Sequence, residues 1–180
     1  NFSYSQFAST AGHDLRFSNE LGMTLNYEVE NWDTAGTSHV WVQLPVLTNQ
    51  TRIWATWGSP DNHQPDYATN GAVWSAGYAG VYHNRESSGP RLDSTPNGRH
   101  GIPFGHATGV TGRIASGNLF DGSGDYIELP STFVLFNGRV ETTVEFWFLT
   151  RSLPADSNWL LSPVLFQGNG ESAWMVTLGD

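Results

Sequence analysis

The sequence predicts an all-β protein that begins with an antiparallel β-sandwich. First, several short segments alternate apolar and polar residues with the period of two that a half-buried strand requires. Second, the 180 residues include 20 glycines and 9 prolines, with 13% aromatic and only 14% charged residues. This profile is typical of strands joined by tight turns and unlike that of a disordered chain. Third, no helical period of useful length occurs in the sequence.

The net charge of -9 argues against nucleic acid and against an anionic membrane surface as partners. A nucleic-acid-binding protein needs a basic surface that neutralises phosphates, and an anionic membrane surface attracts basic segments. The chain contains no cysteine, so thiolate metal sites and cysteine nucleophiles are excluded. No apolar run approaches the roughly 20 residues that span a bilayer.

Three segments of the first half are predicted strands, residues 23–32, 39–44 and 51–57. The second and third are joined by a short polar link, so we expect them to form an antiparallel pair. If their aliphatic faces are inside, Trp41 and Trp54 lie together on the opposite face. The small residues of 67–79 are expected to hold a short helical turn.

The second half contains a predicted β-hairpin at residues 118–130, with a glycine-rich turn at 121–125 between its two strands. Residues 139–150 carry large apolar side chains on both faces, which predicts a central strand. Further strands are expected at 160–167 and 172–178, separated by a Gly-Asn-Gly turn.

The stretch 87–117 is dense in Gly, Pro, Ser and Asn, which indicates a connection between units rather than a loop inside one. The predicted division is therefore a first domain at 1–86, a linker at 87–117 and a second domain at 118–180. Because both predicted domains lack strands, we expect the chain to be part of a larger protein.

The first domain carries a family resemblance in the segments HDLRF, LNYEVENWDTAGTSHVWVQLP and TRIWATWG. Their order and spacing over residues 13–57 resemble the bacterial extracytoplasmic domain of unknown function DUF2341. The resemblance implies that the family's first strands precede Asn1. The segments GVYHNRES and LDSTPNGRHG are similar to that family's bridge into a following domain.

The second domain carries another resemblance, in GRIASGNLFDGSGDYIELP and VEFWFLTRSLPADSNWLLSPVLF. Both segments resemble the start of a laminin-G-like or concanavalin A-like jelly roll. The two resemblances together imply an antiparallel β-sandwich followed by a partial concanavalin A-like jelly roll. That second fold serves binding and adhesion and also hosts glycosidases, so it does not by itself define a function.

Two acidic residues of the second domain are candidates for a pair of glycosidase carboxylates. Glu141 and Glu145 share one face of the strand predicted there, with Thr143 between them. Four extended residues separate them by about 13 Å. Retaining and inverting mechanisms need carboxyl groups about 5 to 9.5 Å apart. The spacing favours ordinary strand residues over a catalytic pair.

A calcium site is predicted at the glycine-rich turn, where Asp121, Asp125 and Glu128 offer the hard oxygen ligands that Ca²⁺ prefers. The alternative is turn chemistry, because aspartate side chains hydrogen-bond the backbone of their own turn. The six histidines are scattered, with neither HxH nor HExxH spacing, so no zinc site is predicted. Serine-hydrolase and nucleotide-binding motifs are absent too.

The eight tryptophans are the remaining signal, since an exposed indole ring packs well against the C–H groups of a sugar. Most tryptophans fill cores, but Trp41 and Trp54 share their strand faces with polar residues. The predicted ligand-binding residues are therefore Trp41, Trp54, Gln43 and Arg52.

Three functions follow as hypotheses. The favoured one is a non-catalytic module of a secreted or cell-surface bacterial protein that binds a polysaccharide or mediates adhesion. The second is a structural module of a surface fibre, or of an envelope machine of the MotA, TolQ or ExbB type, in which another protein chain completes the sheets. The third is a fragment of a concanavalin A-like glycoside hydrolase or lyase. All three place the chain outside the cytoplasm, with no nucleic acid and no direct membrane insertion.

Overall fold

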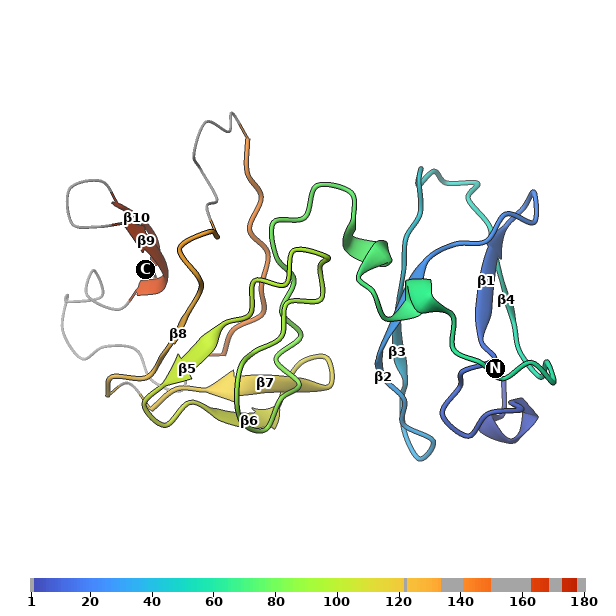
Figure 1. Cartoon of the computed structure of the whole chain (residues 1–180), viewed down its shortest axis with the longest axis horizontal. Coiled ribbons are helices and arrows are strands. Elements are labelled where there is room, and N and C mark those ends of the chain that lie inside the picture. The colour runs from blue at the N-terminus through green and yellow to red at the C-terminus, as the bar shows by residue number, and fades with distance from the viewer. Residues whose placement is uncertain (1, 122, 134–140, 150–162, 169–172, 178–180) are drawn as a thin grey trace. The chain divides into compact units, whose positions relative to one another are not determined.

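The structure is a computed structural model that describes residues 2–121, 123–133, 141–149, 163–168 and 173–177 (Figure 1). Strands dominate this part of the chain, and its helices are the short 3₁₀ turns η1 (Tyr4–Gln6), η2 (Asp66–Ala68) and η3 (Ala72–Trp74). The all-β class is confirmed, and so is the helical turn expected within 67–79. Among the described residues, no helix is long and apolar enough to cross a membrane.

The chain forms two compact units, Asn1–Thr142 and Thr143–Asp180. The described strands form five antiparallel pairs, which are β1 with β4, β2 with β3, β5 with β8, β6 with β7 and β9 with β10. Their bounds are β1 Arg16–Asn19, β2 Tyr27–Asn31, β3 His39–Val42, β4 Ile53–Thr56, β5 Ile102–Phe104, β6 Thr108–Thr111, β7 Ser116–Leu119, β8 Tyr126–Glu128, β9 Pro163–Gly168 and β10 Ala173–Thr177.

The pairing of β3 with β4 expected from the sequence is wrong. Strand β3 pairs with β2, so that Glu28 lies opposite Trp41, and β4 pairs with β1, so that Ser18 lies opposite Trp54. The polar link between β3 and β4 therefore connects two sheets instead of closing a hairpin. Nothing local distinguishes these two arrangements, because both satisfy the same alternation of apolar and polar residues.

The β1–β4 sheet and the β2–β3 sheet are joined by a small aromatic core. Phe17 of β1 meets Tyr27 of β2 edge to face, with ring centroids 5.4 Å apart. The Tyr27 hydroxyl, which is fully buried, donates a 2.7 Å hydrogen bond to the carbonyl oxygen of Leu15. Leu15 and Leu25 are buried beside it. The DLRF segment is thus a structural element of this core.

The segment before β1 is anchored on a second aromatic group. Phe7 packs against Trp32 and Trp57, with centroids 4.9 and 5.7 Å away. Gly12 has a positive φ of 71°, and a Cβ there would collide with the Trp32 ring. These two tryptophans therefore serve packing, as most tryptophans do.

Strands β5 to β8 form a single interrupted hairpin whose turn is at residues 112–115, where the amide of Gly112 donates to the carbonyl of Ala115 (Figure 1). The hairpin expected to turn at 121–125 is therefore wrong. The described residues between β7 and β8, which are 120, 121 and 123–125, instead form part of a bulge opposite the shorter connection 105–107. Asp125 Oδ1 accepts the amide of His106 across this bulge, and a Cβ on Gly105 would collide with that oxygen.

The expected linker, residues 87–117, contains β5 and β6 and several buried polar side chains. Arg91 is fully buried and donates to the side-chain oxygen of Asn118 and to the carbonyls of Gly89 and Ala107. These contacts attach the segment to β7 and to the 105–107 connection. The predicted domain boundaries themselves stay a prediction.

In the second unit, the strands expected at 160–167 and 172–178 are confirmed over their described parts as β9 and β10, and the turn expected between them lies outside the described residues. The strand expected at 139–150 is wrong over its described part, because residues 141–149 belong to no strand. Alternation makes a strand only when a partner supplies a ladder of hydrogen bonds. Glu141 and Glu145 are exposed there.

Candidate functional site

The two acidic residues of β2 are buried, although their period-two spacing would ordinarily place them on a solvated face. Glu28 and Glu30 are only 9% and 6% exposed. Tyr27, on the opposite face, packs on the core described above, and segments from later in the chain cover the acidic face. Strand β2 is therefore buried on both sides, with an aromatic face and an acidic face.

Glu28 receives hydrogen bonds at both carboxylate oxygens. Trp74 Nε1 donates to Oε2 at 2.5 Å, and Ser94 Oγ donates to Oε1 at 3.0 Å. His83 Nε2 lies 3.4 Å from Oε2, and an Arg85 guanidinium nitrogen lies 3.7 Å from Oε1. The side chains that contact this carboxylate belong to η3 and to two segments that follow it in the chain.

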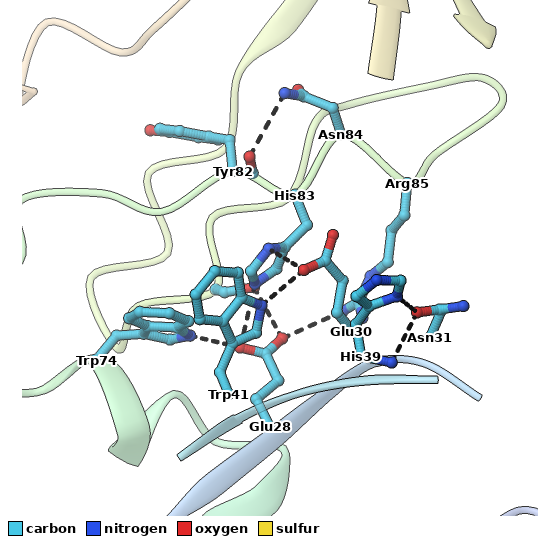
Figure 2. A network of polar contacts seen from close by, with 11 residues as sticks. Glu28, Glu30, Asn31, His39, Trp41, Trp74, Tyr82, His83, Asn84 and Arg85 are labelled. Atoms are coloured by element: carbon cyan, nitrogen blue, oxygen red, sulfur yellow. Dashed lines mark hydrogen bonds and ion pairs between the residues drawn. The ribbon is translucent and has the colours of Figure 1, made fainter. Parts of the chain in front are cut away.

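Glu30 contacts a tryptophan indole, as Glu28 does, and it also contacts His83. Trp41 Nε1 donates to Glu30 Oε2 at 2.6 Å, and His83 Nδ1 lies 3.3 Å from the same oxygen. Figure 2 shows the His83 ring between the two carboxylates, with Trp41 and Trp74 beside it. A neutral imidazole carries one N–H, whereas an imidazolium carries two and can donate toward both glutamates.

Burial and hydrogen bonding act on Glu28 in opposite directions. Burial opposes its ionisation, but the hydrogen bonds from His83, Trp74 and Ser94 and the charge of His83 together lower the pKa of Glu28 below its ordinary value. The carboxylate is therefore ionised at neutral pH. Its environment is that of a fixed acceptor rather than of a group ready to take up a proton.

The loop 93–100 next to this network is fixed by Asp93. The Asp93 carboxylate accepts the backbone amides of Val81, Thr95 and Arg99 and the hydroxyl of Thr95. A Cβ on Gly71 would collide with the backbone of this loop, so η3 begins in close contact with it. The loop is thus held in place by backbone hydrogen bonds and by tight packing.

Two open pockets lie along the loop. One, of ≈ 310 Å³, is lined by Trp74, Ser75, Gly77, Tyr78, Ala79, Pro96, Asn97 and Arg99. The other, of ≈ 340 Å³, is lined by Glu28, Thr69, Asn70, Gly71, Arg85, Leu92, Asp93, Ser94, Thr95, Pro96, Gly98 and His100. Trp74 connects them, because it lines the first pocket and donates to Glu28, which lines the second.

The four residues predicted as ligand-binding are divided between two places. Trp41 lies 5.5 Å from Trp74, and Gln43 reaches Ser75 Oγ at 3.5 Å, so both are near the first pocket. Trp54 and Arg52 are exposed and belong to β4 or to the segment just before it. Trp41 and Trp54 therefore lie on different sheets, because β3 and β4 do not pair.

Asp121 and Asp125, predicted as metal ligands, do come together. With His106 they place one potential ligand atom each within 4.8 Å of one another. Glu128, the third predicted ligand, is outside this group on β8, opposite Ile102. Asp125 accepts the amides of Asp121 and His106, and Asp121 accepts the amide of Ser123. This is the turn chemistry considered as the alternative, and a calcium site stays a prediction.

The residues that the sequence did not single out are Glu28, Glu30, His83 and Ser94. The pattern Glu-Val-Glu was visible as the polar face of a strand. Alternation alone assigns such a face to solvent. The available signal was the presence of Trp41 on the adjacent strand, since an indole N–H beside a carboxylate is a common way to satisfy a buried acid.

The fold and the site define this chain as a strand-rich module with a buried acidic network and two small surface pockets. Residues 11–76 match the family described as Domain of unknown function (DUF2341). The matched part includes Glu28, Glu30, Trp41 and Trp74, whereas His83, Arg85 and Ser94 follow it. No curated protein and no solved structure matches the chain.

Proposed function

We propose that the chain is a non-catalytic glycan-binding or adhesion module of a secreted or cell-surface bacterial protein. Its binding surface, here called the aromatic surface, consists of Trp41 and Tyr78, the largely buried Trp74 that both rings contact, and Gln43, Asn97 and Arg99. The observation that carries the proposal is the exposure of Trp41 and Tyr78, 36% and 50%, beside the pocket that Trp74 and Tyr78 line.

The chemistry of this surface suits a sugar. A pyranose ring presents C–H groups on its faces and hydroxyls at its edges. It therefore fits a site where aromatic rings lie next to amide and guanidinium groups. Tyr78 meets Trp74 edge to face at 5.1 Å, and Trp41 lies 5.5 Å from Trp74. The three rings are continuous, and planar polar side chains border them.

The buried network holds these rings before any ligand arrives. Trp41 and Trp74 each donate their indole N–H to a buried glutamate, which fixes the orientation of both rings. Asn97 donates to the carbonyls of Tyr78 and Ala79, so the opposite wall is also fixed. Binding to such a surface loses little conformational entropy. In this proposal the acidic network is structural support for a binding site.

Retention on insoluble polysaccharides, measured by affinity electrophoresis or a glycan array, tests the proposal. Tyr78→Ala removes an exposed ring and is expected to weaken retention about tenfold or more, because a stacked aromatic contact is lost. Tyr126→Ala is the matched control, since Tyr126 is 51% exposed on β8 and outside the aromatic surface. Equal retention of the two variants would contradict the proposal. Trp54→Ala reports whether Trp54 and Arg52 form a second binding surface.

A structural or assembly function is the second candidate, and the exposed side of the β5–β8 pair favours it. Ile102, Phe104 and Tyr126 are all exposed, and the last two rings stack with centroids 4.8 Å apart. A partly apolar two-stranded sheet can gain a strand from another chain, which would complete the sandwich and the partial jelly roll inferred from the sequence. Light scattering after size exclusion tests this, and a cooperatively melting monomer would exclude it.

A further inference from the structure

We propose that the pocket lined by Glu28, Arg85, Ser94 and His100, here called the polar pocket, binds a pair of neighbouring hydroxyl groups on a sugar ring. The inference takes its ligand class from the proposed function. It names the chemical feature of the sugar that is recognised and a second site, which is joined to the aromatic surface through Trp74.

The pocket contains one fixed hydrogen-bond acceptor. Glu28 is nine-tenths buried, and Trp74 and His83 hold its Oε2. Its Oε1 faces Ser94 and Arg85, which line the same pocket. A carboxylate oxygen accepts more than one hydrogen bond, so Oε1 can take a ligand hydroxyl in addition to that of Ser94.

The pocket also contains donors. The Arg85 side chain is 41% exposed and lies 3.7 Å from Glu28, too far for a direct hydrogen bond, so its N–H groups can reach a ligand. His100 Nδ1 accepts the backbone amide of Asp93 at 3.0 Å. In the neutral ring this places the proton on Nε2, which is then a second donor.

The charges of the pocket favour a neutral ligand. The Asp93 carboxylate already receives four hydrogen bonds from the chain, so it has no need of a cation. The charge of Glu28 is offset by the Arg85 guanidinium, 3.7 Å away. An anion would meet two carboxylates, and a cation would meet the guanidinium. A hydroxyl pair avoids both penalties, because one hydroxyl donates to Glu28 while its neighbour accepts from Arg85.

The Trp74 indole N–H gives a readout of this pocket that does not depend on polysaccharide retention. It donates to the same carboxylate that would accept the ligand hydroxyl. Methyl glycosides of glucose, galactose and mannose are therefore titrated into the folded chain while the tryptophan indole signals are followed by ¹⁵N NMR. A saturable shift of the Trp74 signal is expected that is kept in Tyr78→Ala and lost in Arg85→Ala, with the Trp57 signal unchanged. No shift with any of the three sugars would overturn the proposal.

Three variants locate the site. Arg85→Ala is expected to weaken sugar binding about tenfold, since one charge-assisted hydrogen bond is lost. Ser94→Ala is expected to weaken it less, and Ser87→Ala, an exposed serine outside the pocket, is the matched control. Unchanged sugar affinity in Arg85→Ala would overturn the proposal. The free amino acid glycine is the comparison ligand, because its two opposite charges suit a pocket that selects zwitterions. Tighter binding of glycine than of the sugars would also overturn the proposal.

The two proposals can fail separately. Tyr78→Ala should lose polysaccharide retention yet keep the sugar-dependent shift of Trp74. Loss of retention in Arg85→Ala but not in Tyr78→Ala would exclude the aromatic surface and support the polar pocket. Retention that depends on Tyr78 but is unchanged in Arg85→Ala would exclude the polar pocket and support the aromatic surface.

Discussion

Two groups in this molecule each combine two carboxylates with one histidine, and they differ in what surrounds them. Glu28, Glu30 and His83 are buried, and the indole N–H groups of two tryptophans complete their hydrogen bonds. His106, Asp121 and Asp125 lie in a bulge of a hairpin, where backbone amides complete the hydrogen bonds and the two residues His106 and Asp121 are exposed. Residue type alone therefore does not decide the role of such a group.

The difference shows how environment assigns that role. In the buried group each carboxylate depends on named side chains, so removal of one partner leaves another charge or donor unsatisfied. In the exposed group, water can replace any partner that is lost. The first group should therefore control stability and the position of the aromatic rings, whereas the second remains accessible to an ion.

The largest expected effect is on the buried group. Glu30→Ala leaves the Trp41 indole and one nitrogen of His83 without an acceptor, and the free energy of unfolding should fall by about 3 to 5 kcal/mol. Asp125→Ala, in the exposed group, should lower the melting temperature only slightly. Urea unfolding of both variants measures the contrast. Equal losses in the two would show that burial does not distinguish the groups.

Asp14 distinguishes the effect of burial from the effect of the type of hydrogen-bond partner. It is buried like Glu28, but its hydrogen bonds come from backbone amides, like those of Asp125. It accepts the amides of Ala8, Ser9 and Gly58, and although burial opposes ionisation, these hydrogen bonds lower the pKa of Asp14. Asp14→Asn turns an amide NH₂ toward backbone donors and should cost about 2 to 3 kcal/mol. A loss as small as that of Asp125→Ala would mean that side-chain partners, not burial, set the effect.

The acid dependence of stability gives a third contrast. The pKa of Glu28 is lower in the folded chain than its ordinary value of 4.5, so its stabilising contribution is present above that pH and is lost as the pH falls through the folded pKa. The difference in unfolding free energy between the wild type and Glu28→Gln should therefore shrink as the pH falls below 4.5 and passes through the lowered pKa of Glu28 in the folded chain. A difference that is constant over this range would contradict the assignment.

The smallest expected effect concerns calcium at the exposed group. If Asp121 and Asp125 bind Ca²⁺ with His106 nearby, adding the ion should raise the melting temperature modestly, because it binds only the folded state. Asp121→Asn and Asp125→Asn should remove the increase, whereas Glu128→Gln tests whether the third predicted ligand contributes. An identical melting curve in calcium and in chelator would reject the site.

The sequence by itself determined the all-β class, the positions of most strands and the turn at η3. These properties depend on a period of two and on glycine-rich and proline-rich breaks, which are local. The match of residues 11–76 to DUF2341 agrees with the resemblance seen in its DLRF and VWVQLP segments. The expected pair of Trp41 and Trp54 depended on β3 pairing with β4, and that pairing is not a local property.

Only the tertiary structure decided which strands pair and which polar face is buried. The hairpin expected to turn at 121–125 is not formed, because the strands that flank this segment, β7 and β8, belong to the same arm of a longer hairpin that turns at 112–115. The acidic face of β2 is buried because His83 and Ser94, more than 50 residues away in the sequence, pack against it. Contacts at such separations depend on the summed packing of the whole unit, which no local pattern encodes.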